Sequence, residues 1–219
     1  MNDNRLGGIA LMIGAISGLV TMFLHPLGGQ TTPSQFQQFA TLNISVHSLG
    51  IAGLPFLFLG AMALTRQLDS PGRLALAALV IYGLSLVAVL IAPALSGLVA
   101  TEVIRHIVVQ GPATEQWQRL LSYTFILNQA FSGIFAVGSA AAIALWSFVI
   151  VRKRKVSSAL GVYGLLLGPV VVIAVLRGAL RLGVHGFGLL VISEASWLIA
   201  AGILLLRSKP AEQRSPVAA

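Results

Sequence analysis

The sequence contains no cysteine, which excludes disulfide bonds, thiolate metal ligands, covalently attached c-type haem and cysteine nucleophiles. Charged residues are also scarce: they make up 9% of the 219 residues, whereas a soluble domain carries about 25%. Walker loops, nucleophile elbows, Rossmann glycine patterns and paired-carboxylate motifs are missing, so no enzyme of those kinds is predicted. The shortage of charge excludes an ordinary water-soluble domain and indicates a chain that folds in a bilayer.

The hydrophobic residues, 57% of the chain, come in six long runs. The runs are 6–24, 48–65, 74–101, 120–151, 156–176 and 186–206, of which the last is interrupted only by Glu194. Each is close to or above the ~18 to 20 residues that a helix needs to cross about 30 Å of hydrocarbon. The sequence therefore predicts an all-α protein, a bundle of six transmembrane helices within residues 1–207, followed by a disordered cytoplasmic tail at 208–219.

Basic residues outnumber acidic residues by 14 to 6, and their positions indicate membrane orientation rather than nucleic-acid binding. The segments on one side of the predicted membrane hold ten of the 14, including all of 152–155, and the other side holds four. By the positive-inside rule, both termini are predicted to be cytoplasmic. The run at 152–155 is expected among anionic lipid headgroups, so the expected partner is the bilayer and no nucleic acid.

The other side carries two long polar segments, 26–44 and 100–119, which glycine or proline interrupts. We expect them to be loops, and long loops in compact proteins are more often functional than short ones. Any activity on the soluble side is therefore predicted to face outward.

The four histidines stand at the ends of the runs: His25, His47, His106 and His185. In the predicted topology all four lie at the outer membrane boundary, where with Glu102 they could bind zinc or copper, or two could ligate a b-type haem. Alternatively they are interfacial side chains without a ligand. Glu102 and His106 share one helical face. His25 and His47 flank the same outer segment, and we predict that they approach a common ligand or water.

Glu194 is the only acidic residue deep in a run. A charge near the bilayer centre costs about 2.5 to 3.5 kcal/mol, so the side chain is expected to face the bundle and to be paired or protonated. Arg177 lies at a similar depth across the preceding turn and is the predicted partner. Such a pair either fixes the docking of the last two spans or forms a proton or substrate site.

A short repeat links the second and fifth runs. Residues 49–54 (LGIAGL) and 160–165 (LGVYGL) share the pattern LGxxGL. Three spans in each half would give halves of inverted topology, which many secondary transporters use. Because the chain holds 23 glycines, this match is easily made, and the transporter is kept as one alternative.

Three further segments carry a family resemblance: 24–26 (LHP), 46–50 (VHSLG) and 73–86 (RLALAALVIYGLSL). They resemble a loose class of bacterial six-span inner-membrane proteins that have no assigned activity. The resemblance implies this architecture and a bacterial cytoplasmic membrane, and it carries over no activity or cofactor.

Three functional classes remain open. The first is a non-enzymatic membrane component that binds a hydrophobic small molecule or a membrane partner protein in its bundle, with its polar site on the outer face. The second is a metal- or haem-dependent membrane enzyme or electron carrier that uses the outer histidines. The third is a small transporter.

Overall fold

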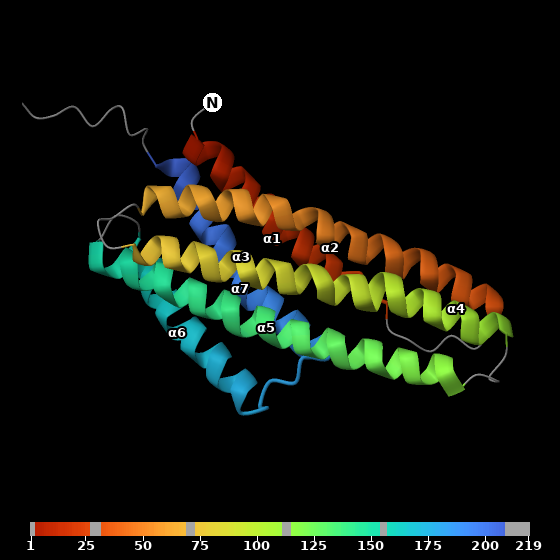
Figure 1. Ribbon diagram of the computed structural model, residues 1–219. Helices are drawn as coiled ribbons and strands as arrows, with labels where there is room; N and C mark the ends of the chain where they lie inside the picture. The colour runs from red at the N-terminus through yellow and green to blue at the C-terminus, as the bar shows by residue number, and fades with distance from the viewer. Residues whose placement is uncertain (1–2, 27–31, 69–72, 111–114, 154–156, 209–219) are drawn as a thin grey trace, which may run out of the picture.

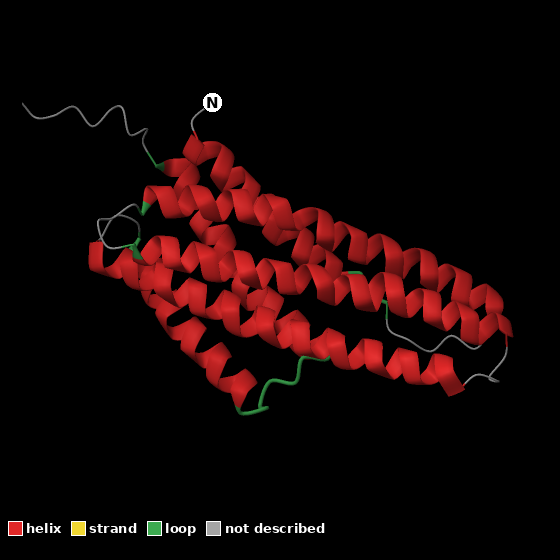
Figure 2. Cartoon of the chain, viewed as in Figure 1, coloured by secondary structure: helices red, strands yellow, loops and turns green. Residues whose placement is uncertain are grey.

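The computed structural model describes residues 3–26, 32–68, 73–110, 115–153 and 157–208. Throughout these residues the regular structure is helical (Figure 2). The elements are α1 (Asp3–Phe23), α2 (Pro33–Gln67), α3 (Leu74–Pro93), the π-helix η1 (Ala94–Val99), α4 (Ala100–Gln110), α5 (Glu115–Lys153), α6 (Ser158–Leu176) and α7 (Val184–Arg207). With α3, η1 and α4 taken as one continuous helix, six helices are long and apolar enough to cross a membrane. The predicted six-helix bundle is confirmed, whereas the expected tail lies, apart from Ser208, outside the described residues.

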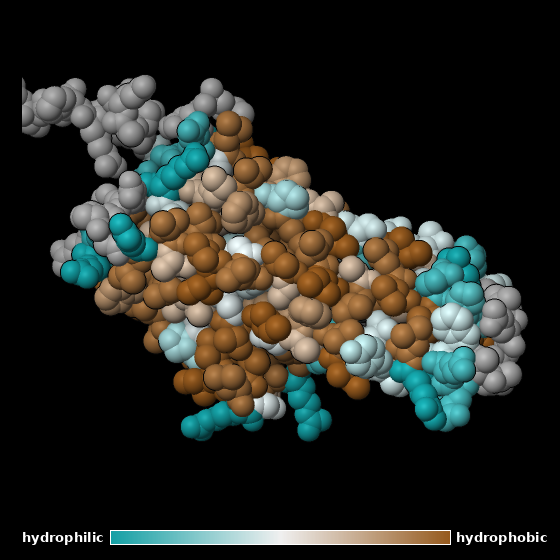
Figure 3. Space-filling model, viewed as in Figure 1, coloured by the Kyte–Doolittle hydropathy of each residue, from teal (hydrophilic) through white to brown (hydrophobic). Residues whose placement is uncertain are grey.

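Large apolar side chains are exposed on all six spans. Figure 3 shows them over the middle of the bundle, with hydrophilic side chains gathered at its two ends and on part of its lower edge. This is the surface that hydrocarbon requires between two aqueous phases. The chain is therefore an integral membrane protein in contact with lipid.

Three helices are much longer than a membrane requires. Helix α2 has 35 residues, α5 has 39, and α3, η1 and α4 run without a break from 74 to 110. At 1.5 Å per residue each exceeds about 50 Å, against about 30 Å of hydrocarbon. Their far ends project together beyond the ends of α1, α6 and α7 (Figure 1). We call this the extended end, and the end that holds Asp3 and Arg207 the terminal end.

The expectation of polar loops at 26–44 and 100–119 was therefore wrong, because most of the described residues of both segments are helical. Helix α2 has its own start signal. The Thr32 hydroxyl accepts a hydrogen bond from the Gln35 backbone N–H, while the Gln35 side chain accepts one from the Thr32 backbone N–H. Pro33 occupies the first turn, as is common at helix starts. This capping box is readable in the sequence and marks the helix start that the loop interpretation missed.

The third span continues past a proline through a π-helix. Pro93 closes α3, and η1 follows before α4 resumes regular geometry. Since a π-helix alters the backbone hydrogen-bond pattern, its carbonyl groups need other donors. Asn43 of α2 supplies them: its Nδ2 donates to the carbonyl oxygens of Ser96 at 3.1 Å and Gly97 at 3.4 Å, and to Thr101 Oγ1 at 2.8 Å. The irregular stretch is thereby fixed to α2.

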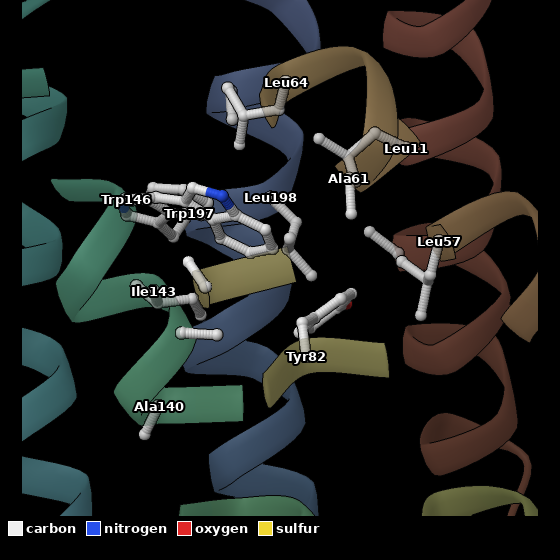
Figure 4. Close-up of a cluster of buried hydrophobic side chains, with 14 of the residues drawn as sticks. Leu11, Leu57, Ala61, Leu64, Tyr82, Ala140, Ile143, Trp146, Trp197 and Leu198 are labelled. Carbon is white, nitrogen blue, oxygen red and sulfur yellow. The ribbon is translucent and has the colours of Figure 1, made fainter. Parts of the chain in front are cut away.

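The six spans form two layers of three helices (Figure 1). Helix α1 lies between α2 and α7 in one layer, and α5 lies between α3 and α6 in the other. Contacts are extensive within each layer and more limited between layers. Aromatic rings fill part of the space between: Tyr82 lies 5.3 Å from Trp146, and Trp146 lies 6.2 Å from Trp197, measured between ring centroids (Figure 4).

The hairpins α1–α2 and α5–α6 pack in the same register. A Cβ atom added at Gly53 of α2 would lie 2.8 Å from Cβ of Ser17 in α1. A Cβ atom added at Gly164 of α6 would lie 3.0 Å from Cβ of Ser147 in α5. Ser147 follows Ser17 by 130 positions, and Gly164 follows Gly53 by 111. Small residues at these contacts let the two backbones approach closely in lipid.

The same two offsets relate a second pair of contacts. A Cβ atom at Gly50 would lie 3.2 Å from Cγ2 of Thr21, and one at Gly161 would lie 2.6 Å from Cγ2 of Val151. Helix α1 begins and α5 ends at the terminal end, so the two hairpins cross the membrane in opposite directions. The LGxxGL repeat thus marks equivalent positions in two hairpins of inverted orientation.

Candidate functional site

A cavity of about 370 Å³ lies between the two helical layers. Helices α1, α2, α3, α5 and α7 line it together with η1, and among the described residues none from α6 does. It extends from the level of Leu57 and Leu198, inside the spans, to that of His25 and Phe125 at the extended end. Its lining is mostly apolar, with a few polar side chains that converge from different helices.

Glu194 supplies the carboxyl group of this cavity. It lies ten residues after Val184, the first residue of α7, which is about 15 Å along the helix and close to the middle of the span. The residue is 3% exposed, and Ser139 Oγ of α5 donates a hydrogen bond to its Oε1 at 2.6 Å. Among the described residues no donor reaches Oε2. One carboxyl oxygen is therefore satisfied by the protein and the other is left for whatever enters the cavity.

The predicted pairing of Glu194 with Arg177 was wrong. Arg177 is the C-cap of α6 and is exposed, and no ion pair joins these two described residues. The depth estimate assumed that helices adjacent in sequence pack face to face. Helix α7 instead packs mainly on α1 and makes only limited contact with α6. The neighbour of Glu194 comes from α5, a helix distant in sequence.

His25 and His47 meet at the extended end of the cavity, and both line it. Their ring centroids are 4.9 Å apart in an edge-to-face arrangement with an interplanar angle of 69°. The predicted approach of the two rings is confirmed, and a shared ligand or water stays a prediction.

Backbone carbonyl groups orient both rings. His25 Nδ1 lies 3.1 Å from the Pro26 carbonyl oxygen, and His47 Nδ1 lies 2.7 Å from that of Asn43. Because a carbonyl oxygen only accepts, these contacts assign the proton to Nδ1 and leave each Nε2 as an acceptor. Burial lowers the pKa of His25, and its hydrogen bond to Pro26 opposes part of that effect. Each ring of the pair is thus an acceptor at its Nε2.

The other two histidines lie apart from this pair. The His106 ring stacks on Trp117 with centroids 4.4 Å apart, and its Nε2 lies 3.5 Å from Glu102 Oε1. Glu102 also pairs with Arg105 at 3.2 Å. His185 is exposed in the first turn of α7. The expected contact between Glu102 and His106 is confirmed, and it lies on α4 rather than in the cavity.

The histidines were predicted as possible ligands of a metal ion or a haem. Within the described ranges no group of three or more His, Asp or Glu side chains lies close enough to hold a metal ion. The four histidines therefore do not gather in one cluster. A haem iron held by two histidines lies between their rings, and the direct ring contact of His25 with His47 leaves no room for a porphyrin between these two.

The sequence interpretation missed the contribution of α5. Its residues Phe125, Asn128, Ser132 and Phe135 all line the cavity, and Ser139 continues the same face. Intervals of three or four residues place them on one side of a helix. The polar members of this face, Asn128, Ser132 and Ser139, lie within an apolar run, and their spacing was the available signal.

Aromatic rings form much of the remaining wall. Tyr82 of α3, Phe125 and Phe135 of α5 and Phe187 of α7 all line the cavity, and the rings of Phe135 and Phe187 lie 5.9 Å apart. Comparison with protein-family models, curated proteins and solved structures found no match, so the interpretation depends on this geometry alone.

Proposed function

We propose that this protein is a non-enzymatic membrane component that binds a hydrophobic small molecule in the cavity between its helical layers. The supporting observation is the cavity itself: about 370 Å³, mostly apolar, with Glu194, His25 and His47 among its few polar groups. Small-molecule sites have volumes of about 300 to 1,000 Å³ and combine apolar walls with a few placed polar groups. A membrane partner protein in place of the small molecule is an outcome that the experiment below distinguishes.

Two matched glycine variants test the proposal. Among the described residues, a Cβ atom at Gly18, which lines the cavity, would meet only Cγ1 of Val191 at 3.6 Å, so leucine there extends into the cavity. A Cβ atom at Gly133 would have no atom of the described part of the chain within 4 Å, and Gly133 is not among the described lining residues, so Gly133→Leu is the control.

We expect mass spectrometry of purified wild-type protein and Gly133→Leu to reveal a co-purifying lipid-like or quinone-like molecule that Gly18→Leu lacks. Equal recovery from all three proteins would contradict the proposal. If a protein co-purifies instead, and Gly18→Leu retains it, the bound component is a membrane partner protein and not a small molecule in the cavity.

We propose that both termini are cytoplasmic and that the extended end faces outward, in a bacterial inner membrane. The terminal end carries Arg5, Arg66, Arg152, Lys153 and Arg207 among the described residues, as the positive-inside rule requires of a cytoplasmic surface. Green fluorescent protein fused to the C-terminus should fluoresce, and alkaline phosphatase inserted between α4 and α5 should be active. The reverse pattern would overturn the orientation.

Transport is the second candidate, and the two equivalent hairpins of inverted orientation favour it. Transporters built from inverted repeats open a central site alternately to the two sides of the membrane. If this chain transports its ligand, wild-type protein in sealed vesicles should accumulate the molecule recovered above and Gly18→Leu should not. Binding without accumulation would leave the first proposal in place and remove this one. The metal- or haem-dependent alternative stays a prediction that a visible spectrum and metal analysis of the same preparation would test.

A further inference from the structure

We infer that the ligand of the cavity is a lipophilic organic cation, held with its positive charge beside Glu194 and its apolar groups against the aromatic wall. This inference rests on the proposed binding function and specifies the class of ligand.

The charge of Glu194 favours a cationic ligand. Glu194 is 3% exposed near mid-membrane, lines the cavity, and has Oε1 bonded to Ser139 but Oε2 without a donor among the described residues. A buried carboxylate is costly unless a cation or donors compensate it. No lysine or arginine is among the described residues that line the cavity. A cationic ligand supplies the compensation that the protein itself does not.

The aromatic composition of the cavity wall also favours a cation. Tyr82, Phe125, Phe135 and Phe187 come from three different helices and face one cavity. The faces of aromatic rings attract organic cations, and desolvation strengthens this attraction. A wall with this many rings beside one carboxyl group combines the two elements that bind quaternary or phosphonium-like cations.

The path from the extended end to Glu194 is also open to a cation. The cavity reaches the extended end, where its polar lining consists of uncharged or acceptor groups such as Asn128, Gln129 and the His25–His47 pair. Gln129 is itself fixed by a hydrogen bond from its Nε2 to the carbonyl oxygen of Leu182 at 2.9 Å. Since none of these lining groups carries a fixed positive charge, a cation meets no fixed repulsion on its way to Glu194.

The test compares two probes on the purified full-length protein in a nonionic detergent. Tetraphenylphosphonium is a permanent lipophilic cation that has no proton to lose, and triphenylphosphine oxide is its uncharged analogue. We expect wild-type protein to bind the cation more tightly than the oxide by about tenfold or more in equilibrium dialysis.

Glu194→Gln keeps the side-chain shape and an acceptor for Ser139 while it removes the charge. It should weaken binding of tetraphenylphosphonium by about tenfold and leave the affinity for triphenylphosphine oxide unchanged. Glu115→Gln is the matched control. It removes the same charge, but from an exposed carboxylate at the start of α5. It should bind both probes as the wild type does.

Phe187→Leu gives a second variant that leaves Glu194 in place and retains an apolar side chain. It should reduce affinity for the cation more than affinity for the oxide, since the net positive charge of the cation is attracted more strongly by the ring quadrupole. If Glu194→Gln is not recovered as a folded protein, Phe187→Leu and the comparison of the two probes on wild-type protein test the inference.

Equal affinity of wild-type protein for both probes would overturn the inference, as would unchanged cation binding in Glu194→Gln. Failure to bind either probe would overturn it as well. None of these results bears on the proposed function, which is judged separately by whether Gly18→Leu loses the co-purifying molecule. Loss of that molecule together with equal probe affinities would mean a neutral hydrophobic ligand.

Discussion

Hairpin α1–α2 lines the cavity with residues from both of its helices, whereas hairpin α5–α6 contributes residues from α5 and, among the described residues, none from α6. Both hairpins nevertheless place a glycine of their second helix against a serine of their first, Gly53 on Ser17 and Gly164 on Ser147. Apolar burial does not drive helices together in lipid, so these small-residue contacts determine how closely each pair packs. The two hairpins therefore share their internal packing. They differ in whether the second helix lines the cavity, which α2 does and, among the described residues, α6 does not.

The difference between the halves is also visible in single positions. Ser139 of α5, which bonds Glu194, corresponds through the 130-residue offset to Ile9 of α1, which is 39% exposed toward lipid. The ungapped alignment of α2 with α6 continues into α3 and α7, where residues 79–81 and 190–192 are both LVI, and it places Gly83 opposite Glu194. The two halves thus share a scaffold, whereas the hydrogen bond between Ser139 and Glu194 belongs to the second half alone.

Alanine at Gly53 and at Gly164 should disrupt both hairpins. The added Cβ atoms would lie 2.8 Å from Ser17 Cβ and 3.0 Å from Ser147 Cβ, and the second would also overlap Ser147 Oγ and lie 2.5 Å from Trp197 Nε1. We expect each substitution to lower the free energy of unfolding by about 2 to 3 kcal/mol through overpacking. Unfolding in detergent, followed by tryptophan fluorescence, measures this.

The control for both is Gly133→Ala, whose Cβ would have no atom of the described residues within 4 Å. It should be neutral or stabilise the protein by up to about 1 kcal/mol, because alanine is the better helix former. Destabilisation by only one of Gly53→Ala and Gly164→Ala would contradict the equivalence of the hairpins.

Ser139→Ala should destabilise the second half by about 1 to 3 kcal/mol, since it removes the described hydrogen-bond donor of a buried carboxyl group. Ser193→Ala is the control: Ser193 is exposed, and its hydroxyl donates to the Leu189 carbonyl oxygen of its own helix. Thermal unfolding in detergent compares the two. Equal losses of stability in the two variants would mean that the hydrogen bond from Ser139 to Glu194 does not stabilise the protein more than an exposed serine does.

A double-mutant cycle tests how each hairpin accommodates a large residue. A Cβ at Gly14 would lie 2.6 Å from Leu57 Cγ, and also 2.8 Å from Leu57 N and 2.9 Å from the Gly53 carbonyl oxygen, so a change at Leu57 can relieve the Cγ contact but not the two backbone contacts. In the other hairpin the small residue is Gly168, whose added Cβ would lie 2.7 Å from Ala144 Cβ. The positions correspond, so the glycine lies on the first helix in one hairpin and on the second helix in the other.

Gly14→Ala should therefore be less harmful when combined with Leu57→Gly, which recreates the arrangement of the second hairpin. We expect a favourable coupling free energy of about 1 kcal/mol between the two substitutions, measured by denaturation of the single and double variants. Strict additivity would show that the two contacts are not interchangeable.

Acid should weaken the first hairpin slightly. Burial lowers the pKa of His25, so the folded protein keeps this ring neutral while the unfolded chain binds a proton near the ordinary value of about 6.5. The resulting stability is present above that pH and is lost as pH falls below it, because the unfolded state then binds more protons.

His25→Phe, which keeps an aromatic ring beside His47, should reduce this loss by less than about 1 kcal/mol between about pH 7.5 and about pH 5. Thermal unfolding of wild type and variant across that range measures it. Identical pH profiles would show that His25 does not titrate differently in the folded state.

The sequence by itself determined the six spans, because the length of an apolar run is a local property that the bilayer reads directly. It also predicted that His25 and His47 approach each other, although His47 lies inside α2 and the two rings meet because α1 packs on α2. The helical start of α2 was equally local, and the capping box at Thr32 would have revealed it. These features depend on residues that are near one another in the chain.

Only the tertiary structure decided which helices face one another. Glu194 and Arg177 are 17 positions apart and do not pair, whereas Glu194 and Ser139, 55 positions apart, do. Lateral order in a bundle follows from small-residue packing along whole helices, with α7 against α1 and α6 against α5, and hydropathy holds no record of that order. The cavity and the partner of its carboxyl group follow from this lateral order, because both are formed where the two layers meet.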